Sequence, residues 1–169
     1  MANTMTLISS VTVGSGGASS ISFSSIPQTY TDLVIKSSVR NTLTNTNWAD
    51  MQLQPNGSTS SLTARSVFGY NGITASNTDT NPSAGFSVRN STANTFSNCE
   101  VYIPNYTSSN YKSWSLDAVT ESNDTSNTID WLGANLWSNT SAITSITISS
   151  IQGTFAQYSN FYLYGIKNS

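Results

Sequence analysis

The stretch YTDLVIKSSVR, residues 30–40, decides the fold class of this chain. Its side chains follow a two-residue period: Leu33, Ile35 and Val39 share one phase, and Asp32, Lys36 and Arg40 share the other. Because successive side chains of a β-strand point to opposite faces of the sheet, this alternation predicts a strand with one buried face.

Similar alternating runs recur along the whole sequence, and no segment has the 3.6-residue apolar period of a helix. We therefore expect about ten strands. Besides residues 30–40, the predicted strands are 5–13, 20–26, 49–54, 62–70, 96–103, 112–120, 129–137, 143–151 and 160–166.

Turn-forming residues separate these runs, at 14–17 (GSGG), 55–58 (PNGS) and 71–72 (NG). Strands spaced in this way, without helical crossovers, predict an all-β, single-domain antiparallel β-sandwich over residues 1–169. The most specific expectation is a jelly-roll-like fold with additional edge strands. Segments 76–94 and 121–128 are polar, and we expect irregular loops there that carry contacts.

Composition limits the function. More than two-fifths of the residues are Ser, Thr or Asn, there is no His, and six basic and eight acidic residues give a net charge of -2. The scattered basic residues form no footprint for nucleic acid. No segment is typical of a signal peptide or a membrane span, so neither secretion by a cleaved signal nor a membrane partner is expected. Without His, a proton carrier that titrates near neutrality is missing, and we expect no enzyme and no cofactor.

Three features of the sequence are candidates for chemical sites. Asp117 and Glu121 could act as a carboxylate pair, but like-signed neighbours on a solvated face are common, and eight acidic residues produce such a pair easily, so the solvated face is the preferred interpretation. Cys99 shares its strand phase with apolar residues and has no His to activate it, which predicts a buried thiol. A set of oxygen donors could surround Ca²⁺ or simply cap a turn, and consists of Asn123, Asp124, Asn127 and Asp130. No catalytic, cofactor-binding or metal-binding residue is assigned.

The aromatic residues suggest two kinds of contact. Trp48 and Tyr111 lie beside polar segments and are candidate glycan contacts, whereas Trp114 and Trp131 lie within strand patterns typical of a core. In residues 129–137 both phases are apolar, which indicates a strand covered on both faces, by its own core and by another subunit. Candidate oligomer or capsid contacts are Trp131, Leu132, Leu136 and Trp137.

The two ends of the chain resemble a known group of proteins. The run SISFSSIPQTYTDLVI at 20–35, which follows a first predicted strand, and the terminal YLYGIK at 162–167 are similar to small β-rich virion structural proteins of tailed bacteriophages. Members of that group serve as capsid decoration or cement proteins and as parts of tail fibres. The resemblance implies a phage particle component and brings no catalytic residues.

The leading functional hypothesis is a capsid decoration or cement protein, a homotrimer that binds the major capsid protein on the outer surface of the virion after synthesis in the host cytoplasm. A first strand that begins close to Met1 favours this role over a fibre with an N-terminal anchor. The alternative is a tail fibre or receptor-binding protein that recognises a host surface glycan. A non-viral carbohydrate-binding module is a third possibility.

Overall fold

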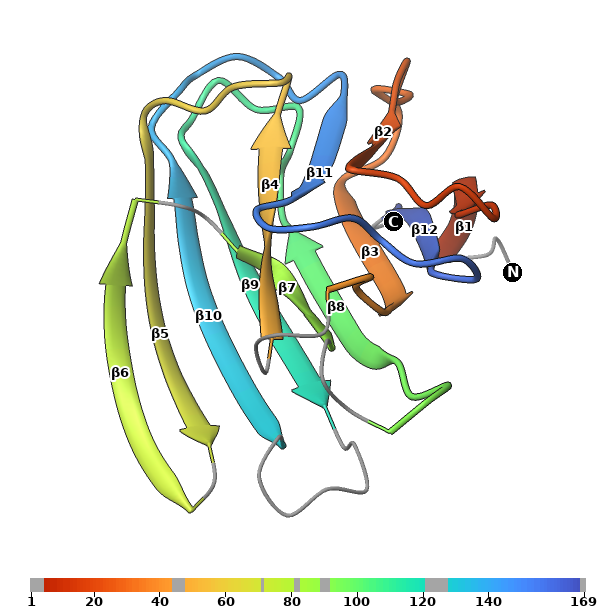
Figure 1. The fold of residues 1–169 in the computed structure, drawn as a ribbon. Coiled ribbons are helices and arrows are strands. Elements are labelled where there is room, and N and C mark those ends of the chain that lie inside the picture. Colours follow the sequence, from red (N-terminus) through yellow and green to blue (C-terminus); the bar gives the residue numbers. More distant parts are fainter. Residues whose placement is uncertain are drawn as a thin grey trace.

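The computed structural model describes residues 5–43, 48–70, 72–80, 83–88, 92–120 and 128–167, which form twelve β-strands and no helix (Figure 1). None of these residues therefore belongs to a helix that could span a bilayer. Every strand pairing is antiparallel, so the predicted all-β antiparallel fold is confirmed. The strands are β1 (Met5–Thr12), β2 (Ser20–Phe23), β3 (Asp32–Val39), β4 (Trp48–Pro55), β5 (Leu62–Tyr70), β6 (Ile73–Asp79), β7 (Ser83–Val88), β8 (Ser97–Ile103), β9 (Lys112–Thr120), β10 (Ile129–Trp137), β11 (Ile146–Ser150) and β12 (Asn160–Ile166).

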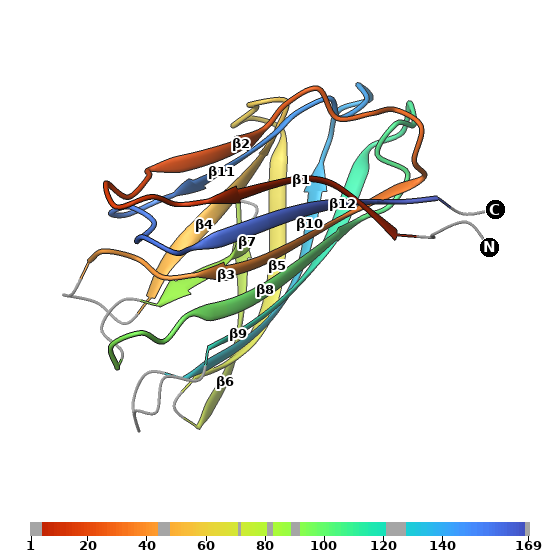
Figure 2. The same cartoon turned by 90° about the vertical axis from the view of Figure 1, so that its right-hand side faces the viewer.

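Two sheets face each other, as the two views in Figures 1 and 2 show. The large sheet has the order β1-β12-β3-β8-β9-β10-β5-β6, and the small sheet has the order β2-β11-β4-β7. The order β1-β12-β3-β8 opposite β2-β11-β4-β7 is that of an eight-stranded jelly roll, in which successive strands alternate between the sheets.

The remaining four strands are two hairpins inserted into the jelly roll. The β5–β6 hairpin lies between β4 and β7 in the chain, and the β9–β10 hairpin lies between β8 and β11. Both extend the large sheet at one end, because β10 pairs with β9 on one side and with β5 on the other. The large sheet therefore projects beyond the edge strand β7 of the small sheet, and Figure 1 shows β5 and β6 without a strand of the small sheet in front of them.

The prediction that segment 76–94 is irregular is wrong, because it contains most of β6 and all of β7. Strand β6 is the outermost strand of the large sheet and is almost entirely exposed, so it needs no apolar alternation. Ala84 and Phe86 of the short strand β7 are buried, and Gly85 between them interrupts the pattern. A Cβ atom on Gly85 would lie 2.4 Å from Cys99 Sγ, so glycine is what lets β7 pack this closely on β8.

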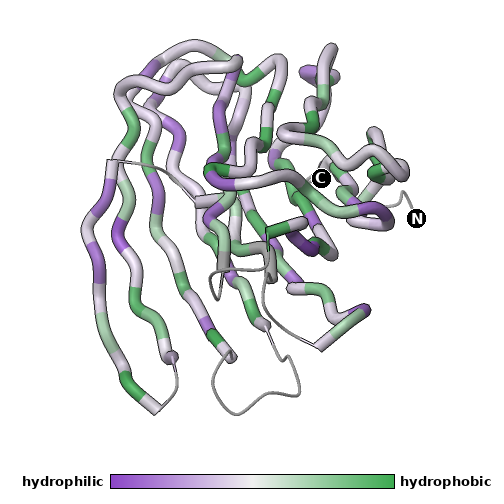
Figure 3. Tube along the Cα trace, in the orientation of Figure 1, coloured by the Kyte–Doolittle hydropathy of each residue, from purple (hydrophilic) through white to green (hydrophobic). Residues whose placement is uncertain are grey.

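The core lies between the two sheets and is built from apolar residues of both. Figure 3 shows hydrophobic segments interspersed with hydrophilic ones along the strands. In β9 alternate residues from Lys112 to Thr120 are buried. Cys99 is buried as predicted, and so is Trp114. Asp32 was placed in the polar phase of its strand, but it is buried because it accepts hydrogen bonds from Asn105 N (2.9 Å) and Tyr102 Oη (2.8 Å).

The two segments that carry the family resemblance are in contact with each other. Strand β12 pairs with β3 so that Gly165 lies opposite Leu33, and the Thr31 amide donates to the Ile166 carbonyl at 2.7 Å. The ring of Tyr30 covers Gly165, where an added Cβ atom would lie 2.4 Å from the ring. A side chain at position 165 is therefore incompatible with this position of Tyr30.

We expect Gly165→Ala to lower the free energy of unfolding by about 1–3 kcal/mol, because the new methyl group overlaps a packed aromatic ring. Urea denaturation followed by tryptophan fluorescence measures this change. The matched control is Gly69→Ala in β5, where a Cβ atom meets no other atom within 4 Å. Equal stability of the two variants would contradict this account of Gly165.

Candidate functional site

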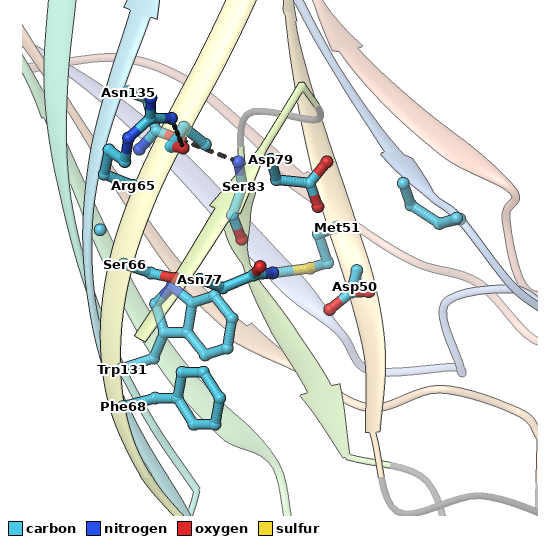
Figure 4. A pocket seen from close by; sticks show the side chains of 13 residues that line it. Asp50, Met51, Arg65, Ser66, Phe68, Asn77, Asp79, Ser83, Trp131 and Asn135 are labelled. Atoms are coloured by element: carbon cyan, nitrogen blue, oxygen red, sulfur yellow. Dashed lines mark hydrogen bonds between the residues drawn. The ribbon is translucent and has the colours of Figure 1, made fainter. Parts of the chain in front are cut away.

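A hollow of about 230 Å³ lies where the large sheet projects beyond the small one (Figure 4). Side chains from β5, β6 and β10 of the large sheet line it, together with residues of β4 and β7 at the edge of the small sheet. The lining residues are Asp50, Met51, Ala64, Arg65, Ser66, Phe68, Asn77, Asp79, Ser83, Trp131, Gly133, Asn135 and Ile151. The inserted hairpins thus create the hollow, since they supply the strands that overhang the small sheet.

Strand β10 forms the floor of the hollow. Trp131, Gly133 and Asn135 alternate along the strand and share the face that looks toward the small sheet, and Ser66 pairs with Gly133 from β5. Gly133 leaves the space between the two larger side chains unfilled. A Cβ atom at this position would lie 3.2 Å from Leu116 Cβ and 3.5 Å from Asn135 Nδ2. Glycine within a strand often marks such a close approach.

Aromatic contacts hold the indole of Trp131 in place. Its ring stacks on Phe68 with a centroid distance of 4.6 Å and an interplanar angle of 11°. Phe86 of the small sheet packs against it in a T-shaped arrangement at 4.4 Å. Trp131 is thus fixed on two sides, so the position of its indole N–H group is fixed as well.

Two hydrogen-bond donors of this wall lack an acceptor within the described part of the chain. They are Trp131 Nε1 and Asn135 Nδ2, and both atoms are buried. Asn135 is only 4% exposed, and its Oδ1 accepts a hydrogen bond from the Ser83 amide at 3.1 Å, which fixes the orientation of the side-chain amide. A buried donor without a partner costs about 1–3 kcal/mol. Such donors are typical of sites that a ligand or water completes.

Acceptors line the same hollow. Asp50 and Asp79 contribute carboxylates, and Asn77 contributes a side-chain amide. Asp79 Oδ1 accepts from the Thr80 amide at 2.6 Å and Asn77 Oδ1 from the Thr78 amide at 2.8 Å, so local backbone contacts orient both side chains. The hollow therefore offers both donors and acceptors to a bound molecule.

The predicted contact residues of β10 separate onto opposite faces of the sheet. Trp131 packs partly against the core, as the core interpretation expected. It also lines the hollow. Trp137 is 2% exposed beside the buried Lys112, so a role for it as a surface contact is withdrawn. Leu132, 58% exposed, and the half-buried Leu136 share the opposite phase. One apolar phase of this strand thus faces the protein interior, and the other faces the surface.

Leu132 belongs to an apolar cluster on the outer face of the large sheet. It pairs directly with Val67 of β5, and Val119 of β9 is its diagonal neighbour, since Val119 pairs with Asp130. Val67 is 46% exposed and Val119 is 41% exposed. We call Val67, Val119 and Leu132 the outer-face patch. It lies on the other side of the sheet from the hollow.

Of the two candidate glycan contacts, the structure describes the side chain of one. Trp48 begins β4 in the small sheet, but its side chain lies outside the described part of the structure. Tyr111 is 59% exposed just before β9, and it does not line the hollow. The hollow could not be recognised from the sequence. Most of its polar residues lie in β5 and β6, and they come together with the residues of β10 only after β10 pairs with β5.

The acidic constellations assemble no site among the described residues. Asp117 lies on the outer face of β9, and Glu121 falls outside the described residues. The same holds for Asn123, Asp124 and Asn127, whereas Asp130 is exposed in β10. In the described ranges no three acidic or Cys side chains are grouped so that they could hold a metal ion.

No protein-family model, no curated protein and no solved structure matches this chain. The assignment of function therefore depends on the fold and on the two surfaces described above.

Cys99 provides a test of the packing behind the hollow. Burial raises the pKa of its thiol from its ordinary value of 9.0 to about 11. The folded chain therefore holds this proton more tightly than the unfolded chain between pH 9 and about 11, and stability should fall as pH rises through that window. Stability measured by urea denaturation across this range checks the direction.

The same burial predicts that Cys99 resists an aromatic disulfide reagent at pH 8 in the native protein and reacts fully in concentrated guanidinium chloride. Absorbance of the released thiolate reports the reaction. Fast labelling of the native chain would mean that β7 and β8 separate readily.

Proposed function

We propose that this chain is a non-enzymatic structural protein of a bacteriophage virion, a capsid decoration or cement protein that binds the outer surface of the capsid lattice. The observation that carries this proposal is the outer-face patch, an exposed apolar cluster on the broad outer face of an eight-stranded sheet. The resemblance of residues 20–35 and 162–167 to phage virion proteins supports it independently.

The contact would depend on apolar burial and hydrogen bonding more than on charge. The chain carries six basic and eight acidic residues, and Lys36 on the outer face already forms an ion pair with Glu100 at 2.7 Å. Each hydrogen bond adds about 0.5–1.5 kcal/mol, and repetition over many copies on a lattice multiplies weak contacts. Binding of this kind depends weakly on salt.

The proposal includes self-association as a homotrimer, for which Leu132 and Leu136 remain the candidate contacts. Trp137→Ser would not test this association, because that substitution removes a core side chain and would destabilise the fold. Leu132 is exposed, so its substitution changes the molecular surface and leaves the core intact. Sedimentation of the wild-type chain at micromolar concentration then reports its oligomeric state.

A tail fibre or receptor-binding protein that recognises a host surface glycan is the second candidate. The hollow between the sheets favours it, because a receptor-binding protein needs a site with hydrogen-bonding groups for a small polar ligand. A decoration protein that also contacts the host would use both surfaces.

We expect the double variant Val67→Asn, Leu132→Asn to bind the capsid at least about tenfold more weakly, because two exposed apolar side chains are lost from the contact. Phage particles stripped of the protein are reloaded with each variant, and thermal release of DNA measures capsid stability. The wild-type chain should raise the release temperature, and the double variant should raise it less.

The matched control is Ile73→Asn, which removes an apolar side chain that is 64% exposed on the other face of the sheet. This variant should stabilise capsids as the wild type does. If the wild-type chain leaves the release temperature unchanged, the cement role fails and the receptor-binding alternative gains.

A further inference from the structure

We propose that the hollow between β10, β5 and β6 and the edge of the small sheet binds one uncharged sugar ring, with hydroxyl groups that pair with Trp131 Nε1 and Asn135 Nδ2. This site is independent of the capsid role, because it lies on the opposite face of the large sheet from the outer-face patch.

The two donors without partners indicate what a ligand must provide. Trp131 Nε1 and Asn135 Nδ2 both need acceptors, and both belong to side chains whose orientations are fixed by Phe68 and by the Ser83 amide. Fixed donors bind a matching acceptor without losing further conformational freedom. A ligand with two neighbouring oxygen atoms satisfies this requirement.

The acceptors in the same hollow narrow the ligand class. Asp50 and Asp79 already have partners within the chain, but a carboxylate can accept more than one hydrogen bond, so a ligand that donates as well as accepts suits the hollow. A hydroxyl group does both through one oxygen atom. A carboxylate or phosphate ligand would supply acceptors only, and the two carboxylates of the lining, Asp50 and Asp79, outnumber its one cation, Arg65.

The shape and apolar parts of the hollow fit a ring. Trp131, Phe68 and Met51 present apolar surface next to the polar groups, which suits the C–H faces of a sugar. The volume of about 230 Å³ is below the roughly 300–1,000 Å³ of pockets for drug-sized molecules. A single ring, such as the terminal residue of a glycan, therefore fits better than an extended chain.

Nuclear magnetic resonance of the ¹⁵N-labelled full chain tests the proposal. The probes are the methyl glycosides of glucose, galactose, mannose and N-acetylglucosamine, and the comparison compounds are cyclohexanol, acetate and inorganic phosphate. At least one glycoside should shift the indole N–H signal of Trp131 saturably, with a Kd of about 1–10 mM as expected for so small a ligand. The buried indoles of Trp114 and Trp137 should not respond.

Variants then locate the binding site. Trp131→Phe identifies the indole signal and removes one donor, and Asn135→Asp keeps an acceptor for the Ser83 amide but removes the other donor. Each should weaken glycoside binding about tenfold, the loss expected for one hydrogen bond from a buried donor. Ser66→Leu places a larger side chain on the floor of the hollow beside Gly133 and alters neither donor, so it should abolish glycoside binding. This variant keeps the proposal testable if Asn135→Asp fails to fold.

The matched control is Leu7→Ser on β1, an exposed apolar residue away from the hollow, which should bind as the wild type does. The proposal is overturned if no glycoside shifts the Trp131 signal, if Ser66→Leu binds normally, or if acetate, phosphate or cyclohexanol shifts that signal as strongly as the glycosides. A response confined to the signal of Trp48 would also overturn it, since the sugar would then bind elsewhere.

Discussion

The pairing of β10 along its whole length with β9 on one side and β5 on the other is the interaction on which the binding surfaces depend. It joins two hairpins that are separate in the chain and extends the large sheet of the jelly roll beyond the small one. Because side chains alternate along a strand, one set of β10 residues lines the hollow and core while the other set lies on the outer face. Loss of this pairing would remove both surfaces together.

The alternation of apolar and polar residues was sufficient to predict the all-β class and ten of the strands. It failed for β6, where exposure on both faces removes any need for a pattern, and for β7, where Gly85 replaces the expected side chain. The hollow could not be predicted because it depends on register: Ser66 meets Gly133 only after β5 and β10 pair. A glycine between Trp131 and Asn135 was the one local signal of an unfilled position.

The segments that resemble phage proteins serve the scaffold. Tyr30 covers Gly165, Thr31 bonds to Ile166, and Asp32 is buried against the backbone of Asn105. These contacts join β3 to β12 and fix the loop after β8, and the hydroxyl of Tyr106 in that loop reaches the Pro27 carbonyl. The two segments are adjacent in the folded chain, which gives a physical reason for their occurrence together.

The scaffold and the candidate binding surfaces belong to different parts of the chain, and this affects how function is assigned. The resembling segments build the jelly roll, whereas the outer-face patch and most of the hollow belong to β5, β6, β9 and β10, in the part of the sequence without a recognisable counterpart. A hairpin inserted between jelly-roll strands can change its surface residues without disturbing Tyr30 or Gly165, because its pairing extends the sheet at the far end. In this chain the terminal segments therefore belong to the jelly-roll scaffold, and the inserted hairpins carry the candidate binding surfaces.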